Sequence, residues 1–249
     1  MELLNNTFTF YDVEAYNAST LNGFAFRRGN DERQGLSLSL GNMVRGYAFE
    51  LQGIRFHNSE CAYIAGAFSG GTYTHIAIQR RLGFIAKKTI SKPHEREKRD
   101  DWESFNIEWM KYVVWQKCLG NEDFRRLLLS LPSDAVIIED STFQTGRTAT
   151  KWGTRNDEQR RRLTLLKKKL KARGLSKAAI KREQDRMRLG EYATVGCFVG
   201  QNLMGKILMA CKEALESGIE PDIDYDLLIG KHINILGREI SFNQRGGVS

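Results

Sequence analysis

The sequence has little of what marks secreted, membrane or metal-binding proteins. It contains three prolines, and it has no apolar run of about 18 residues, the length that a membrane-spanning helix needs. Its first residues, Met1 to Asn6, lack the basic and apolar blocks of a secretory signal. These absences predict a compact soluble protein that stays in the cytoplasm.

Cysteine is also scarce, and the spacing of the cysteines indicates neither a metal site nor a redox site. The four cysteines are far apart in apolar surroundings, at Cys61, Cys118, Cys197 and Cys211. A C-x-x-C pair would have indicated a zinc site or a dithiol redox site, and none is present. We therefore expect reduced thiols, most of them packed in the interior.

The positive charge is concentrated in one segment. The chain has 249 residues, 41% of them apolar, enough for one sizeable core, and its net charge is +8. Residues 155–188 hold fourteen Lys or Arg against four Asp or Glu, a local balance of +10. The rest of the chain therefore sums to −2, so the basic character belongs to an insertion in a nearly neutral body.

The basic segment predicts a helical hairpin. Asn156 or Asp157 can cap a first helix, which has leucines at helical spacing and ends at Gly174. Ser176 can cap a second helix from Lys177 to Leu189.

Such a hairpin could bind phosphate groups, because many cations on a short segment create a concentrated field. The cations that we expect to contact nucleic acid are Arg160, Arg161, Arg162, Lys167, Lys168, Lys169 and Lys171. The alternative is a solvated excursion with a thin apolar stripe, which is the more common meaning of a charge run. Both interpretations remain open on the sequence.

The rest of the chain predicts helices and a few short strands. Strands are expected at residues 36–40, 47–51, 54–56 and 135–138, with a turn at 52–53. Helices are expected from a Ser59 cap to residues 69–71, at 102–120, at 123–131, and at 203–215. Residues 225–242 are expected to form short strands or a small appended part of the fold.

Several motifs occur in one order along the chain. They are Gly53-x-x-Phe56-x-Asn58-Ser59-Glu60, Asp101-Trp102-Glu103, Met110, Gln116-Lys117, Leu127-Leu128-Leu129, Ile138-Glu139, Trp152-Gly153 and Gly200-x-Asn202-Leu203-x-Gly205-x-x-Leu208-Met209. The ordered set resembles the NADAR superfamily, also called YbiA-like. On this resemblance residues 1–216 form one domain, residues 154–190 are the inserted hairpin, and residues 217–249 are a C-terminal extension packed on the core.

The resemblance implies a fold and a chemistry. The fold is α+β and predominantly helical, of the compact YbiA-like type, with a cleft for an N-linked ribose compound. Some members of the family hydrolyse early riboflavin-pathway intermediates, and others remove ADP-ribose from guanine in modified nucleic acid. The resemblance implies no metal and no other cofactor.

Two acidic residues are the first candidates for this chemistry. Breaking an N-glycosidic bond develops positive charge on the anomeric carbon, so a carboxylate beside the sugar stabilises the transition state. Glu60 matches the acidic position of the family, and Glu139 follows an apolar strand. A Glu in a first helical turn also stabilises the helix through its dipole, and Glu139 could be a surface acid.

The remaining candidates would contact the substrate. Trp102 and Trp152-Gly153 match aromatic positions of the family, although tryptophan is more often a core residue. Asn202 and Lys206 share a helix face, where Asn202 could bind ribose or phosphate. Lys206 could attack the anomeric carbon and form an imine, or it could be an ordinary solvent-facing lysine.

Two further positions complete the predicted site, and one departs from the family. A helix beginning at Gly200 would offer amide groups to a diphosphate, and Asn22 corresponds to a substrate contact near the N-terminus. Ala149 stands where related sequences hold Asp, and Asp140 is a possible substitute. We expect the patches around Glu60 and Asn202 to be the two halves of one pocket.

The sequence thus predicts an N-glycosidase that removes ADP-ribose from guanine in modified nucleic acid. The basic hairpin favours this substrate, because a small metabolite would not need its field. A hydrolase of riboflavin-pathway intermediates is the alternative enzyme. A module that binds ADP-ribose or modified nucleic acid without cleavage is the alternative outside enzymes, and Ala149 suggests it.

Overall fold

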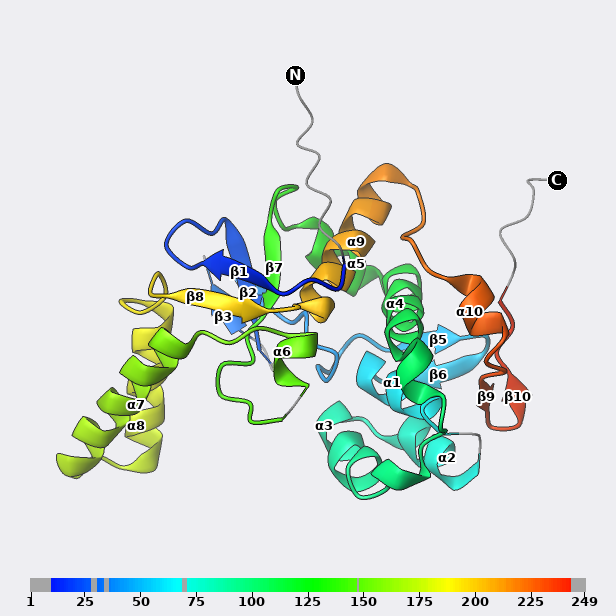
Figure 1. Ribbon diagram of the computed structural model, residues 1–249, viewed down its shortest axis with the longest axis horizontal. Helices are drawn as coiled ribbons and strands as arrows, with labels where there is room; N and C mark the ends of the chain where they lie inside the picture. The colour runs from blue at the N-terminus through cyan, green and yellow to red at the C-terminus, as the bar shows by residue number, and fades with distance from the viewer. Residues whose placement is uncertain (1–9, 28–30, 34–35, 69–70, 147, 243–249) are drawn as a thin grey trace. The chain divides into compact units, whose positions relative to one another are not determined.

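The computed structural model describes residues 10–27, 31–33, 36–68, 71–146 and 148–242 (Figure 1). Within these residues the fold is α+β and predominantly helical, and each sheet has two strands. No helix in this part of the chain is long and apolar enough to span a membrane. The expectation for Met1 to Asn6 lies outside the described residues.

The chain divides into two units. The first comprises residues 1–27, 31–38 and 134–209, and the second comprises residues 28–30, 39–133 and 210–249. The helix α9 (Leu203–Ser217) contains the last boundary, so that its residues up to Met209 belong to the first unit.

Three small sheets belong to the first unit. Their strands are β1 (Glu14–Asn17), β2 (Gly23–Phe26), β3 (Asp31–Arg33), β4 (Leu36–Leu38), β7 (Val136–Glu139) and β8 (Cys197–Gly200). The strands β2 and β7 are parallel, whereas β1 with β8 and β3 with β4 are antiparallel. Ala25, Ile138 and Phe198 form a buried apolar cluster across β2, β7 and β8. The sequence predicted β4 and β7 but missed the other four strands.

The inserted hairpin has the predicted form. Its helices α7 (Asp157–Ala172) and α8 (Lys177–Leu189) lie side by side (Figure 1). Asn156 and Ser176 cap them, because each side-chain oxygen accepts a hydrogen bond from an amide in the first helical turn. The short helix α6 (Ala149–Trp152) precedes the hairpin.

The second unit is built on helices. They are α1 (Ser59–Gly66), α2 (Gly71–Gln79), α3 (Gly83–Ala86), α4 (Trp102–Gly120), α5 (Glu122–Leu129) and α10 (Tyr225–Ile229). A π-helical turn (Lys87–Ser91) continues α3, and a 3₁₀ turn (Glu95–Glu97) follows. Two hairpins complete the unit, β5 (Phe49–Leu51) with β6 (Ile54–Phe56) and β9 (Asn234–Ile235) with β10 (Arg238–Glu239).

Helix α4 is the central element of the second unit. It contacts α1, α5, α10 and β5, and its apolar residues are buried on most sides, as its sequence predicted. The indole Nε1 of Trp109 donates a hydrogen bond to the carbonyl of Ala62 at 3.2 Å. A Cβ at Gly66 would lie 2.3 Å from that nitrogen. The glycine therefore lets α1 approach the tryptophan.

Two details of the sequence interpretation are wrong in this unit. The cap of α1 is Asn58 and not Ser59, because the Asn58 Oδ1 accepts from the amide of Cys61 at 3.0 Å. The helix ends at Gly66, before the expected residues 69–71, of which 69 and 70 lie outside the described residues. The short strands expected within residues 225–242 are β9 and β10. The helix α10 precedes them, and Asp224 caps it by accepting from the amide of Leu227.

One charged side chain lies inside this helical core. Lys117 of α4 is 1% exposed, and its Nζ lies 3.6 Å from the ring centre of Phe124. Burial lowers the pKa of Lys117 from 10.5 to about 8. The folded state therefore binds fewer protons than the unfolded state between these two values, and stability rises with pH through this window.

We predict that Lys117→Met stabilises the protein at pH 7. The free energy of unfolding should increase by about 1–3 kcal/mol, because methionine carries no charge to desolvate. The gain should shrink as pH rises from 8 to 10, where the wild-type amine loses its proton. Urea unfolding at several pH values measures this, with the exposed Lys92→Met as control. A loss of stability at pH 7 would show that the Phe124 contact outweighs the burial cost.

Candidate functional site

The predicted site residues fall into two groups, one in each unit. Glu60 and Trp102 belong to the second unit. The first unit holds Asn22, Glu139, Trp152, Gly153, Gly200, Asn202 and Lys206.

Glu60 is a nearly buried carboxylate at the start of a helix. It lies in the first turn of α1 and is 6% exposed. Its backbone amide donates to the carbonyl of Asn42 at 3.0 Å, and the Asn58 cap fixes the same turn. The Nζ of Lys87 lies 3.4 Å from its Oε1. Because a buried charge is costly without compensation, this ion pair explains how a carboxylate is held here.

The sequence interpretation missed Lys87 as the partner of Glu60. Lys87 comes from the π-helical turn after α3, and α3 packs closely on the start of α1. A Cβ at Gly83 would lie 2.8 Å from both the Asn58 Oδ1 and the Glu60 Cβ. No local sequence motif predicts this contact, because it depends on how the helices α1 and α3 pack against each other.

Trp102 is a core residue in this structure. It is 4% exposed, and its ring centre lies 4.9 Å from that of Tyr63 and 5.3 Å from that of Phe105. Burial is the main cause that raises the pKa of Tyr63, and the negative charge of Glu60 is the second. Burial also raises the pKa of Cys61 to about 12, so this thiol stays protonated at neutral pH. The arrangement supports packing by Trp102 rather than the expected stacking on a ligand.

In the first unit, predicted residues converge on the carboxyl end of β7. Glu139 is the last residue of that strand and is partly exposed. Its amide donates to the Asn202 Oδ1 at 3.0 Å, and its carbonyl accepts from the amide of Thr154 at 2.8 Å. The backbone of Glu139 is thus hydrogen-bonded at both its amide and its carbonyl, which fixes the point from which its side chain extends.

Asn202 has a structural role that contradicts the expected ligand contact. It is 0% exposed, and its Nδ2 donates to the carbonyl of Ile137 at 2.8 Å. Both ends of its amide therefore bind the backbone of β7. Its φ of 53° places it in the left-handed region, which Asn tolerates better than most residues.

Two glycines allow the chain to pass closely at this point. A Cβ at Gly153 would lie 2.6 Å from the carbonyl oxygen of Glu139, and one at Gly200 would lie 2.3 Å from that of Gly153. Gly200 is the last residue of β8, and α9 begins at Leu203, where the sequence predicted the helix. Trp152 lies just before Gly153 at the end of α6 and is partly exposed.

Lys206 is engaged by the N-terminal part of the unit. It is 7% exposed, and its Nζ lies 2.5 Å from the Glu14 Oε1. It also donates to the carbonyls of Asp12 at 3.1 Å and Phe10 at 3.3 Å. These three oxygen contacts occupy the amine, and little of the side chain is open to a ligand. The geometry therefore contradicts the proposed attack by Lys206 and gives it a structural role.

Asn22 lies at the wrong end of the strands for a contact beside Glu139. Its backbone carbonyl accepts from Val136 at the amino ends of β2 and β7, and its side chain donates to Asp134. The register pairs Phe26 with Glu139 at the opposite ends of these strands.

A buried ion cluster links the end of β7 to the hairpin. The side chain of Asp140 is fully buried, with the Arg27 Nε at 3.3 Å and an Arg188 guanidinium nitrogen at 3.9 Å. Arg27 also lies 4.0 Å from Asp185. Since Asp185 and Arg188 belong to α8, the cluster ties this helix to the strand that carries Glu139. Sequence reasoning noted Asp140 but found neither arginine, because the three are far apart in the chain.

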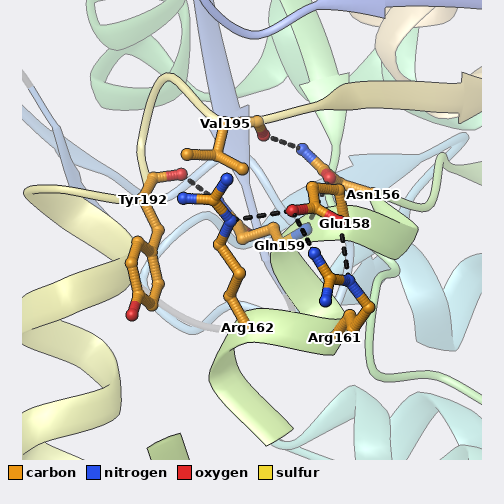
Figure 2. A network of polar contacts seen from close by, with 7 residues as sticks. All are labelled: Asn156, Glu158, Gln159, Arg161, Arg162, Tyr192 and Val195. Atoms are coloured by element: carbon orange, nitrogen blue, oxygen red, sulfur yellow. Dashed lines mark hydrogen bonds and ion pairs between the residues drawn. The ribbon is translucent and has the colours of Figure 1, made fainter. Parts of the chain in front are cut away.

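A second network holds the start of the hairpin, as Figure 2 shows. The Asn156 Nδ2 donates to the carbonyl of Val195 at 2.7 Å, and the Gln159 Nε2 donates to that of Tyr192 at 2.9 Å. Glu158 accepts hydrogen bonds from Arg161 and Arg162. These two arginines, predicted to contact nucleic acid, are therefore already paired.

Comparison with solved structures shows a distant likeness in fold. No protein-family model matches the chain, and no curated protein matches it. Among solved structures, the NMR structure of the E. coli protein YbiA is similar, with a TM-score of 0.49 and 15% sequence identity. The match covers 84% of this chain and 98% of that chain.

We predict that Asn202→Ala destabilises the protein by about 2–4 kcal/mol, because it leaves the amide of Glu139 and the carbonyl of Ile137 without partners. Asn202→Gly should cost about 1 kcal/mol less, since glycine accepts the left-handed backbone without strain. Denaturant unfolding of both variants measures this. Unchanged stability in both would restore Asn202 to the list of ligand contacts.

Proposed function

We propose that this chain is a member of the NADAR superfamily and an N-glycosidase. Its reaction is the hydrolysis of the bond between ribose and a base, and its substrate is ADP-ribosylated guanine in nucleic acid. Water attacks the anomeric carbon, the carbon–nitrogen bond breaks, and the departing base takes up a proton.

The observation that carries this proposal is the environment of Glu60. The ordered motifs give this residue the acidic position of the family, and its carboxylate is nearly buried in the first turn of α1. A carboxylate shielded from water stabilises the positive charge of a ribosyl transition state more strongly than an exposed one. The ion pair with Lys87 holds the group in place.

Glu139 and Trp152 are proposed as further contributors. Both are partly exposed, and the close passage of Gly153 past the Glu139 carbonyl brings their backbones together. Glu139 is proposed as a carboxylate for proton transfer, and the Trp152 indole as an apolar surface for a base. Asn202, Gly153 and Gly200 hold the backbone near these two side chains in place.

The basic hairpin supports nucleic acid over a free metabolite as the carrier of the modified guanine. The segment from Gln159 to Arg182, both included, holds eleven cations and no acidic residue. A field of this strength attracts a polyanion and adds little to the binding of a small nucleotide.

We predict that Glu60→Gln lowers the rate of ADP-ribose release by about 100- to 1,000-fold, because the neutral amide stabilises developing positive charge poorly. Its affinity for the modified oligonucleotide should stay within threefold. Chromatographic product analysis on a guanine-modified oligonucleotide measures release. Glu122→Gln is the matched control, since Glu122 also lies in a first helical turn, that of α5, and is exposed.

The same assay decides between the alternatives. Equal release by Glu60→Gln and wild type would remove Glu60 from the mechanism. Hydrolysis of an early riboflavin-pathway intermediate, without release from the oligonucleotide, would overturn the substrate. Saturable binding of the modified oligonucleotide by wild type with no product from either substrate would show a binding module in place of an enzyme.

A further inference from the structure

Most cations of the hairpin are of two kinds. Five lie close to a carboxylate. Arg188 belongs to the Asp140 cluster, and we call the other four the paired cations: Arg161 and Arg162 at 2.8 Å from Glu158, Lys181 at 2.6 Å from Asp185, and Arg186 at 2.6 Å from Glu183. Their charges are locally compensated. Whatever binds them must first compete with these acidic neighbours.

The second kind lies at the tip of the hairpin, residues 167–177, where α7 ends and α8 begins. Its exposed cations are Lys167, Lys168, Lys169, Lys171, Arg173 and Lys177. None of them has an ion-pair partner within the described part of the chain, and no Asp or Glu occurs between Gln159 and Arg182. The tip therefore carries uncompensated positive charge.

The packing of the hairpin turns these cations outward. Leu163 and Leu170 of α7 and Ile180 of α8 are buried, and the Gln184 Nε2 donates to the carbonyl of Leu163 at 3.1 Å. The apolar side chains thus face the seam between the helices. Lys167 and Lys171 are one turn apart on one side of α7, whereas Lys169 points to another side. Positive charge surrounds the tip instead of forming one narrow stripe.

We propose that the tip, residues 167–177, is a binding surface for the phosphate backbone of nucleic acid, and that the paired cations are structural. This deepens the proposed function by locating its macromolecular contact, although the binding itself does not require the glycosidase. It also corrects the sequence expectation, which placed Arg161 and Arg162 on the binding surface.

The composition of the tip selects nucleic acid among polyanions. A membrane-surface helix exposes a continuous apolar face, but here Leu163, Leu170 and Ile180 are buried, and the exposed Leu165 lies outside the tip. A protein interface has an apolar or aromatic centre and is poor in lysine, whereas the tip is rich in lysine and has no aromatic residue. Flexible, hydrated ammonium groups suit sequence-independent contacts to phosphates.

The base of the hairpin gives this surface a fixed position in its unit. The Asn156 and Gln159 hydrogen bonds and the Asp140 ion cluster hold both helices at their ends away from the tip. Binding therefore does not need to order a flexible segment, which would reduce the affinity.

The test compares two variants that lose the same charge. The tip variant carries Lys167→Gln, Lys168→Gln, Lys169→Gln and Lys171→Gln, and the control carries Arg161→Gln, Arg162→Gln, Lys181→Gln and Arg186→Gln. Glutamine has nearly the helix propensity of lysine and arginine, so both hairpins should remain helical, which circular dichroism checks. The probe is an unmodified 20-base-pair DNA duplex, followed by fluorescence anisotropy from 50 to 200 mM salt.

We expect the tip variant to bind the duplex about 10- to 100-fold more weakly at 50 mM salt, and the control variant to change by less than about threefold. The slope of log affinity against log salt should become shallower by about 0.9 for each lost phosphate contact, and so by about 3–4 for the tip variant. Equal weakening of both variants would overturn the assignment to the tip.

Other partners give distinct results. Binding of polyglutamate or of phosphatidylserine vesicles as tight as that of the duplex, with the same loss in the tip variant, would overturn nucleic acid as the partner. Cleavage of an ADP-ribosylated guanosine mononucleotide separates this inference from the proposed function. The tip variant should cleave it like wild type, and tip-dependent DNA binding by a protein that cleaves nothing would refute only the glycosidase.

Discussion

The first unit depends on the hydrogen bonds between the side chain of Asn202 and the backbone of β7. A buried amide must satisfy its donor and its acceptor, and Asn202 does both on one strand, at Ile137 and Glu139. This clamp sets the start of α9 against the end of β7. Gly153 and Gly200 leave room for the chain to pass beside it. The position of the Glu139 backbone follows from these constraints.

The same strand end also anchors the hairpin. Asp140 follows Glu139 directly, and its buried carboxylate lies between Arg27 and Arg188. Removing one member of such a cluster leaves a buried charge uncompensated, which is costly. The hairpin is therefore built into the unit at its base, and its cations include ion-paired side chains along the helices and uncompensated charges at the tip.

The second unit presents its candidate acid differently. Glu60 is held by the Asn58 cap and by Lys87, and the surrounding side chains are packed. Tyr63 and Trp102 fill the space beside it as core residues. A carboxylate in such surroundings has few water molecules to screen its charge. This is the physical basis for the proposal that it stabilises positive charge on ribose.

Local signals in the sequence determined the elements that depend on local interactions. The two hairpin helices, their Asn156 and Ser176 caps, and the limits of α4 follow from spacing, capping residues and glycine stops, and they agree with the structure. The strands β1, β2 and β8 could not be predicted, because each has only four residues and exists through pairing with a distant segment.

The roles of the site residues were decided by tertiary structure. The motif order selected Glu60, Asn202 and Lys206 together, but the tertiary structure gives each a different role. Glu60 is a shielded acid, Asn202 clamps a backbone, and Lys206 is an ion-pair partner of Glu14. Sequence spacing records which side chains are present on a helix face. Only the fold decides which of them meet another backbone, because hydrogen bonds and charge pairs form between segments that are far apart in the chain.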